Sequence, residues 1–166
     1  MSAQDEVDRI VTAWERERPD LDPAPLQVFS RLSRLARQLE LARREAFHTH
    51  GLESGAFDVL SALRRAGEPY ELTPGKLLAE TLVTSGTMTN RINRLARAGY
   101  VQRAKDPSDG RVVLVRLTAE GKAVVDAALA DLLDWEAELL EGLDDSAQAK
   151  LAGLLRRLAA PFEEAS

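Results

Sequence analysis

The sequence predicts a mainly helical protein with one small β-hairpin. Three observations lead to this fold class. Apolar residues recur at helical spacing over most of the 166 residues. The pattern changes only over residues 100–117, where two strand-like runs flank a cluster of turn residues. Most of the expected helices also begin or end at a capping residue, a glycine or a proline.

Two amphipathic helices are expected before residue 52. The apolar face of the first consists of residues at i, i+3, i+4 and i+7, namely Val7, Ile10, Val11 and Trp14. Pro19 ends this helix. Asp22 is expected to cap the second helix, which is long, and Gly51 suits its left-handed C-terminal end.

Three shorter helices are expected next. The third covers about residues 53–65. The fourth covers about residues 74–81, because Thr73 is a good N-cap and Pro74 a good first helical residue. Thr84-Ser85-Gly86 opens the fifth, which ends near residues 98–99.

A hairpin and two further helices complete the chain. Residues 100–103 lead into the turn cluster Asp106-Pro107-Ser108-Asp109-Gly110, and the valine-rich residues 111–117 form the returning strand. The sixth helix begins at Thr118 and continues towards residue 142. One of the residues 144–146 caps the last helix, and Pro161 lies at its end.

Composition excludes several classes of protein. The absence of cysteine excludes disulfides, thiolate metal sites and a thiol-based switch. The only two histidines, His48 and His50, have no third ligand in sight, so solvated or capping roles are favoured over metal binding or pH sensing. We expect no metal and no cofactor. The longest charge-free stretch has ten residues, too few for a membrane span, and the acidic N-terminus is no signal peptide. A cytoplasmic protein is expected.

Enzymatic activity finds no support in the sequence. Thr73-Pro74-Gly75-Lys76 lacks the preceding glycine and the strand that a phosphate-binding loop requires. There is no cysteine nucleophile, and neither histidine has an evident catalytic partner.

The charge is distributed unevenly along the chain. The formal net charge is −5, yet residues 84–116 contain seven basic and two acidic residues and so carry +5. The rest of the chain therefore carries −10. A basic block within an acidic protein is typical of a DNA-facing module on an acidic scaffold.

The fifth helix is expected to have two different faces. Three apolar residues can be buried in the core, namely Met88, Ile92 and Leu95. The opposite face carries four side chains that can contact phosphates and base edges, namely Thr87, Asn90, Arg91 and Arg94. Thr84 and Ser85 at the helix start can donate to phosphate. A merely solvated polar face is the alternative.

The hairpin extends this basic surface. It adds Arg103, Lys105 and Arg111 around a tight tip, which can enter the minor groove beside the helix in the major groove. The short fourth helix, the polar fifth helix and the hairpin together predict a winged helix-turn-helix that binds double-stranded DNA. The amphipathic helices at both ends need partners, which favours a two-fold homodimer on a pseudo-palindromic operator.

Five segments carry a resemblance to a known family: Leu72-Thr73-Pro74, Ser85-Gly86-Thr87-Met88-Thr89-Asn90-Arg91-Ile92, Gly99-Tyr100-Val101, Asp106-Pro107-Ser108-Asp109-Gly110-Arg111 and Leu117-Thr118-Ala119-Glu120-Gly121. With their spacing, they resemble the MarR family of bacterial transcriptional regulators. The resemblance implies a homodimeric repressor. The wing of that family often has Asp-Arg-Arg where this chain has Asp109-Gly110-Arg111, which leaves Arg111 as the expected minor-groove contact.

Two further segments, residues 14–22 and 57–60, resemble the urate-responsive branch of that family. The resemblance implies a pocket for a small anionic effector formed by Trp14, Asp58, Arg91 and Arg103. It also implies three regions. Residues 1–50 would form dimerisation helices and a pocket wall, residues 51–118 the DNA-binding domain, and residues 119–166 the C-terminal dimerisation helices.

Alternatives stay open for each of these assignments. Trp14 can serve plain dimer packing, Asp58 can pair with Arg64 or Arg65, and Arg103 can be a phosphate contact only. The effector can be a phenolic acid, an antibiotic or a tricarboxylate instead of urate. A winged-helix module for protein interaction without DNA binding is the rival from another functional class.

Overall fold

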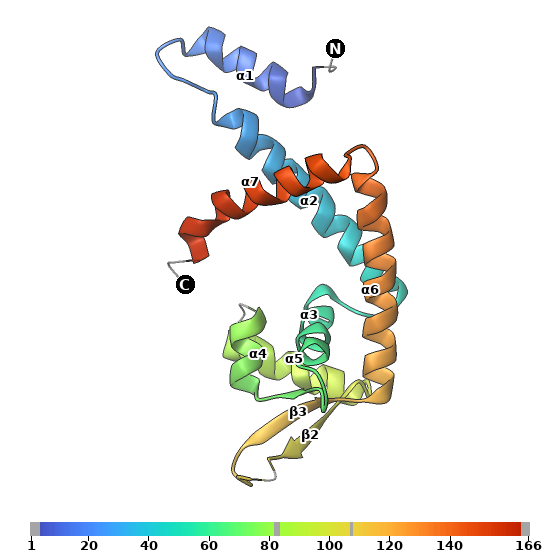
Figure 1. The fold of residues 1–166 in the computed structure, drawn as a ribbon. Helices are drawn as coiled ribbons and strands as arrows, with labels where there is room; N and C mark the ends of the chain where they lie inside the picture. The colour runs from blue at the N-terminus through green and yellow to red at the C-terminus, as the bar shows by residue number, and fades with distance from the viewer. Residues whose placement is uncertain (1–3, 82–83, 107, 164–166) are drawn as a thin grey trace. The chain divides into compact units, whose positions relative to one another are not determined.

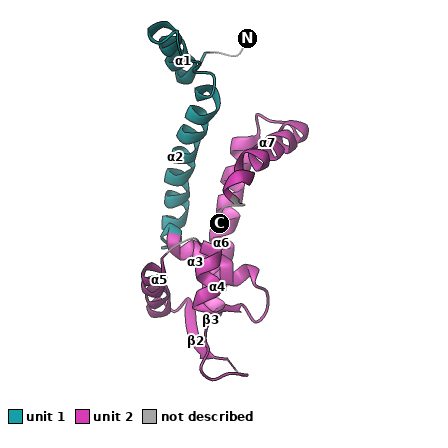
Figure 2. Ribbon diagram, turned by 90° about the vertical axis from the view of Figure 1, so that its left-hand side faces the viewer, with its two compact units in different colours: residues 1–54 teal, residues 55–166 magenta. Residues whose placement is uncertain are grey.

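The computed structural model describes residues 4–81, 84–106 and 108–163, which form seven helices and three short strands. This confirms the predicted fold class, a mainly helical chain with a small hairpin. The chain divides into two compact units, residues 1–54 and 55–166 (Figure 2). The predicted division into three functional regions stays a prediction.

The first unit consists of α1 (Glu6–Glu17) and α2 (Leu26–Thr49), packed against each other. Asp5 caps α1, because its carboxylate accepts the N–H groups of Val7 at 2.8 Å and of Asp8 at 3.0 Å. Val7 and Val11 are buried, as the helical spacing predicts. Arg31 on α2 donates to both Asp5 and Asp8, at 2.8 Å each, and so ties the start of α1 to α2.

The expected cap of α2 was wrong. The helix begins after Pro25, which supplies no side-chain cap. Asp22 instead accepts the N–H of Ala24 at 2.9 Å and stabilises the turn that precedes the helix. A capping side chain accepts N–H groups two or three residues further on. For Asp22 these positions are Ala24, which precedes the helix, and Pro25, which has no N–H. The left-handed glycine after α2 is confirmed, with φ of 68° at Gly51.

The second unit contains all the remaining elements (Figure 1). They are α3 (Ser54–Arg65), β1 (Glu71–Leu72), α4 (Pro74–Thr81), α5 (Ser85–Arg97), β2 (Val101–Lys105), β3 (Val113–Leu117), α6 (Ala119–Leu140) and α7 (Asp145–Glu163). The strands form an antiparallel sheet in the order β1-β3-β2. The hairpin of β2 and β3 projects from the helices of this unit (Figure 1).

The helix starts in this unit are mostly those that the sequence predicts. Hydroxyl oxygens of Thr73, Thr84 and Thr118 accept N–H groups from the first turns of α4, α5 and α6. Of the three candidates for α7, Asp144 makes the capping bond, at 2.8 Å to the N–H of Ala147. Pro161 lies in the last turn of α7, at the end of the helix as predicted.

An aromatic clamp holds the start of the sheet to the neighbouring helices. The Tyr70 ring contacts two cations, with Arg64 Cζ at 5.1 Å and Lys122 Nζ at 4.9 Å from its centroid. Arg64 also donates to Asp126 of α6 at 2.8 Å. Cation–π contacts of this kind stabilise the pairing of α3 with α6. The clamp fixes the base of the winged module.

Many large apolar side chains stay exposed on the long helices. In α6 and α7 they include Leu129, Leu133, Leu151, Leu154 and Leu155, and in the first unit Val28, Phe29 and Leu35. Such apolar surface is typical of helices that pair with another protein surface. Among the described residues, none of the helices is both long enough and apolar enough to cross a membrane.

Candidate nucleic-acid interface and effector site

The two faces of α5 differ as the sequence predicts. Met88, Ile92 and Leu95 are buried against the core of the second unit. Thr87, Asn90 and Arg94 on the other side are exposed. The helix is therefore anchored by one face and presents amide, hydroxyl and guanidinium groups on the other, which are the groups that read base edges in a major groove.

The start of α5 offers donors for a phosphate. Thr84 and Ser85 are exposed, and Thr84 is the N-cap. The Thr84 hydroxyl donates to the Thr87 hydroxyl at 3.0 Å. The unpaired N–H groups and the dipole at a helix N-terminus favour an anion at this position.

The wing tip is ordered by its two acidic residues. Asp106 Oδ1 accepts the Ser108 hydroxyl at 2.6 Å and the Ser108 N–H at 2.7 Å. The Ser108 hydroxyl, followed by the backbone donors, holds the pKa of the Asp106 carboxyl below its usual value. Asp109 accepts the N–H of Arg111 at 3.0 Å. These carboxylates shape the turn, while Lys105 and Arg111 stay exposed beside them. Pro107 of the predicted turn lies outside the described residues.

Arg103 is held beside α5. It lies on β2 opposite Val115, and its Nη2 donates to Asn93 Oδ1 at 2.8 Å. Asn93 was not among the predicted site residues, because its side chain was not assigned to either face of α5. The hydrogen bond keeps the Arg103 guanidinium where α5 meets the hairpin of β2 and β3.

Arg91 lies differently from the other polar residues of α5. Its side chain is half-buried, and its guanidinium lies over Gly55 of α3. The Nη1 atom is buried and has no hydrogen-bond partner among the described residues. Of the two roles expected for Arg91, this position favours the effector site over a DNA contact.

Asp58 lies on α3, one helical turn after Gly55, and is exposed. Each of the two arginines named as a candidate partner of Asp58 makes an ion pair in the structure. Arg64 pairs with Asp126 at 2.8 Å, and Arg65 pairs with Glu80 at 3.4 Å. The second unit therefore supplies Asp58, Arg91 and Arg103 from α3, α5 and β2.

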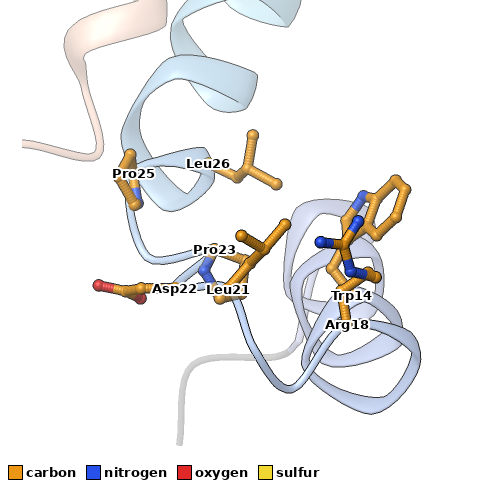
Figure 3. A pocket seen from close by; sticks show the side chains of 7 residues that line it. All are labelled: Trp14, Arg18, Leu21, Asp22, Pro23, Pro25 and Leu26. Carbon is orange, nitrogen blue, oxygen red and sulfur yellow. The ribbon is translucent and has the colours of Figure 1, made fainter.

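Trp14 belongs to the first unit and lines a pocket of about 400 Å³ at the turn between α1 and α2 (Figure 3). Trp14 is 50% exposed. The pocket is mainly apolar, with Leu21, Pro23 and Leu26 in its wall, and the Asp22 carboxylate is turned away from the indole (Figure 3). Such a surface suits a flat ring that stacks on the indole.

The histidines form no metal centre with other described residues. His48 is exposed at the end of α2, and no group of three or more His, Asp or Glu in the described ranges is arranged to hold a metal ion.

Comparisons with known proteins point to one family. The model of the MarR family matches residues 50–112. The chain is 33% identical over 153 residues to the HTH-type transcriptional regulator PecS of Dickeya dadantii, which covers 92% of each chain. It is also similar to the crystal structure of a mutant MarR from E. coli in complex with operator DNA. The TM-score is 0.67 and the identity 25%, covering 87% of this chain and 96% of that one.

A third similar protein has a known effector. It is Bordetella bronchiseptica BpsR, whose structure is described with the mechanism by which 6-hydroxynicotinic acid regulates its DNA binding. The TM-score is 0.60 and the identity 25%, covering 76% of this chain and 91% of that one.

Proposed function

The chain belongs to the MarR family of DNA-binding transcriptional regulators, and we propose that it is a homodimeric repressor whose operator binding is weakened by urate. The observation that carries this proposal is the half-buried Arg91 on an otherwise exposed polar recognition helix. The relatives of this chain are transcriptional regulators and not enzymes. The alternative of a winged-helix module without DNA binding does not agree with this family.

The DNA-binding surface would consist of the α5 face and the wing. Asn90 and Arg94 would read base edges in the major groove, while Thr84, Ser85 and Thr87 would contact phosphates. Lys105 and Arg111 would reach the backbone and the minor groove from the wing. The exposure of these side chains supports the assignment.

Two copies of the chain would be needed to bind one operator. Dimeric helix-turn-helix proteins place their recognition helices about 34 Å apart, one turn of DNA. The exposed leucines of α6 and α7 support a dimer, because apolar surface of this extent is usually covered by a partner.

The effector would bind to the guanidinium groups. Urate is flat and carries one negative charge at neutral pH, so Arg91 and Arg103 can hold its oxygens, and Trp14 can stack on its ring. The anion would compete with Asp58 for an arginine. Because Arg91 lies on α5, a change in its position would alter how α5 docks on DNA. Allosteric couplings of about 1–3 kcal/mol are usual for such pairs of ligands.

A second candidate effector is an aromatic acid. The effector named for BpsR, 6-hydroxynicotinic acid, is a flat ring with a carboxylate. It offers the same two features as urate, a stacking face and an anion. Tricarboxylates share only the charge and would not use the stacking surface of Trp14.

Titration of urate against an operator complex tests this proposal. DNA from beside the gene should bind the wild-type protein in a gel shift, and urate should release it. Arg91→Ala and Trp14→Ala should still bind the DNA but resist urate. The effector site is wrong if both variants respond to urate like the wild-type protein. Release by 6-hydroxynicotinic acid but not urate would favour the second candidate.

A further inference from the structure

A side chain at position 55 would collide with the Arg91 guanidinium. A Cβ atom built on Gly55 would lie 2.5 Å from both Nε and Nη2 of Arg91, and closer still to its Cζ. Real Cβ atoms essentially never approach another heavy atom this closely. The backbone conformation of Gly55 is an ordinary helical one, so the glycine is explained by the neighbouring guanidinium and not by its own φ angle.

The guanidinium is therefore seated in the space that a side chain at position 55 would occupy. This seat connects α3 to the recognition helix α5. It also lies one helical turn from Asp58 on α3. Within the seat Nη1 is buried and lacks a hydrogen-bond partner among the described residues. A buried donor in this state gains most from an acceptor that reaches it.

We propose that Gly55 is a positioning residue, which seats the Arg91 guanidinium so that an anionic effector can accept a hydrogen bond from Nη1. A side chain at position 55 would move the guanidinium out of the seat. Because an arginine side chain is flexible, this displacement changes the position of the charge at little cost to the fold. The inference rests on the proposed effector response, and the test below separates the two.

The first measurement examines the seat without any effector. The Arg91 guanidinium Nε–H signal is identified in the ¹⁵N–¹H spectrum by its loss in Arg91→Lys. Its exchange with solvent should be at least about tenfold faster in Gly55→Ala than in the wild-type protein. Gly153→Ala is the matched control, since Gly153 is also helical and a Cβ there meets nothing within 4 Å. Equal exchange rates in Gly55→Ala and wild type would contradict the claim that Gly55 positions the Arg91 guanidinium.

The second measurement uses urate and operator DNA. Wild type and Gly153→Ala should release DNA at the same urate concentration, while Gly55→Ala should need at least tenfold more. The operator Kd of Gly55→Ala should change less than about threefold, because the exposed face of α5 is intact. A merely structural role would weaken operator binding and leave the urate midpoint in place, and that result would overturn the proposal.

Two further outcomes are also decisive. If Gly55→Ala does not fold, Arg91→Lys keeps the glycine but cannot place Nη1 in the seat, and it should show the same loss of urate response. A normal urate midpoint in Arg91→Lys would contradict the proposal. If the wild-type complex ignores urate, the proposed effector fails, and the exchange measurement alone decides whether the seat exists.

Discussion

At the scale of single residues, the clearest prediction concerns Gly121 at the start of α6. A Cβ there would lie 2.9 Å from Leu117 Cδ1 and closer still to the Tyr100 carbonyl oxygen. Backbone atoms yield less readily than a flexible side chain, so Gly121→Ala should lower the free energy of unfolding by about 1–3 kcal/mol. Thermal unfolding measures this change.

The control for this substitution is Gly153→Ala in α7, where a Cβ meets open space. Here alanine should stabilise the helix by about 0.5–1 kcal/mol, because glycine loses more backbone entropy on folding. Equal melting temperatures for the two variants would contradict the close approach of α6 to Tyr100.

Two basic residues should affect DNA binding in different ways. Arg94→Ala should relax base preference at one operator position, with a loss of about 1–3 kcal/mol for the preferred base. Lys105→Ala should weaken binding to all sequences similarly and reduce the salt slope by about one, since a phosphate contact carries no sequence information. Binding measured across a set of single-base operator variants separates the two. A base-specific loss in Lys105→Ala would contradict this assignment.

The sequence predicts which residues are buried where local periodicity decides the buried face. Met88, Ile92 and Leu95 are buried as expected, because helical spacing determines which face meets the core. It does not predict the seat of Arg91 on Gly55. That contact joins residues 36 positions apart, and no local pattern in the sequence indicates it.

At the scale of elements, the contact of α1 with α2 should depend on pH. The backbone N–H of Asp8, followed by the Arg31 guanidinium, lowers the pKa of Asp5, and Arg34 lowers the pKa of Glu6. The Asp8 N–H belongs to α1 itself, so docking on α2 supplies only the Arg31 part of the Asp5 shift, together with the Arg34 effect on Glu6. A carboxyl whose pKa is lowered by docking stabilises the docked state above its undocked pKa. This contribution is lost as the pH falls through the lowered value.

Docking of α1 should therefore be constant near neutral pH and weaken below the ordinary pKa values of 3.8 for Asp5 and 4.5 for Glu6. The docking of α1 on α2 can be followed by Trp14 fluorescence in a Trp135→Phe background. Circular dichroism is the control for global unfolding. Asp5→Asn should weaken docking at pH 7 as well. An emission spectrum that is independent of pH between 7 and 3 would contradict the role of these ion pairs.

The wing tip allows a second prediction at this scale. Asp106→Ala removes the acceptor of the Ser108 hydroxyl and N–H groups. The tip should become less ordered. The operator affinity should fall about fivefold, which corresponds to about 1 kcal/mol of binding free energy. Asp106→Asn keeps an acceptor oxygen and removes a negative charge near phosphate, so it should bind DNA at least as tightly as wild type. Fluorescence anisotropy with labelled operator compares them, and equal affinities for Ala and Asn would contradict the structural role of the carboxylate.

The ends of helices and strands can be predicted from the sequence where a capping residue or a clear hydrophobic periodicity marks them. The threonine caps of α4, α5 and α6 are the predicted ones. The strand β1 was missed, because two residues are too short for a pattern and Glu71–Leu72 is a strand only through its pairing with β3. Asp22 was misassigned as a helix cap, because its carboxylate accepts the N–H of Ala24 in the turn and α2 begins only after Pro25.

At the scale of the whole molecule, the family follows from one contiguous region. Residues 72–121 hold the short helix, the recognition helix and the wing in order, so motif and spacing together predicted the family that the comparisons show. The effector could not be predicted in the same way. The proposed effector site would combine side chains from residues 14, 58, 91 and 103, which are far apart in the chain.

The central claim is that two copies of an acidic protein bind one DNA duplex through basic surfaces. The most direct test is the mass and salt dependence of the operator complex, measured by sedimentation at several salt concentrations. We expect two chains per duplex and a logarithm of affinity that falls linearly with the logarithm of salt, by about 0.9 per phosphate neutralised. A complex with one chain per duplex, or an affinity that does not change with salt, would contradict the claim.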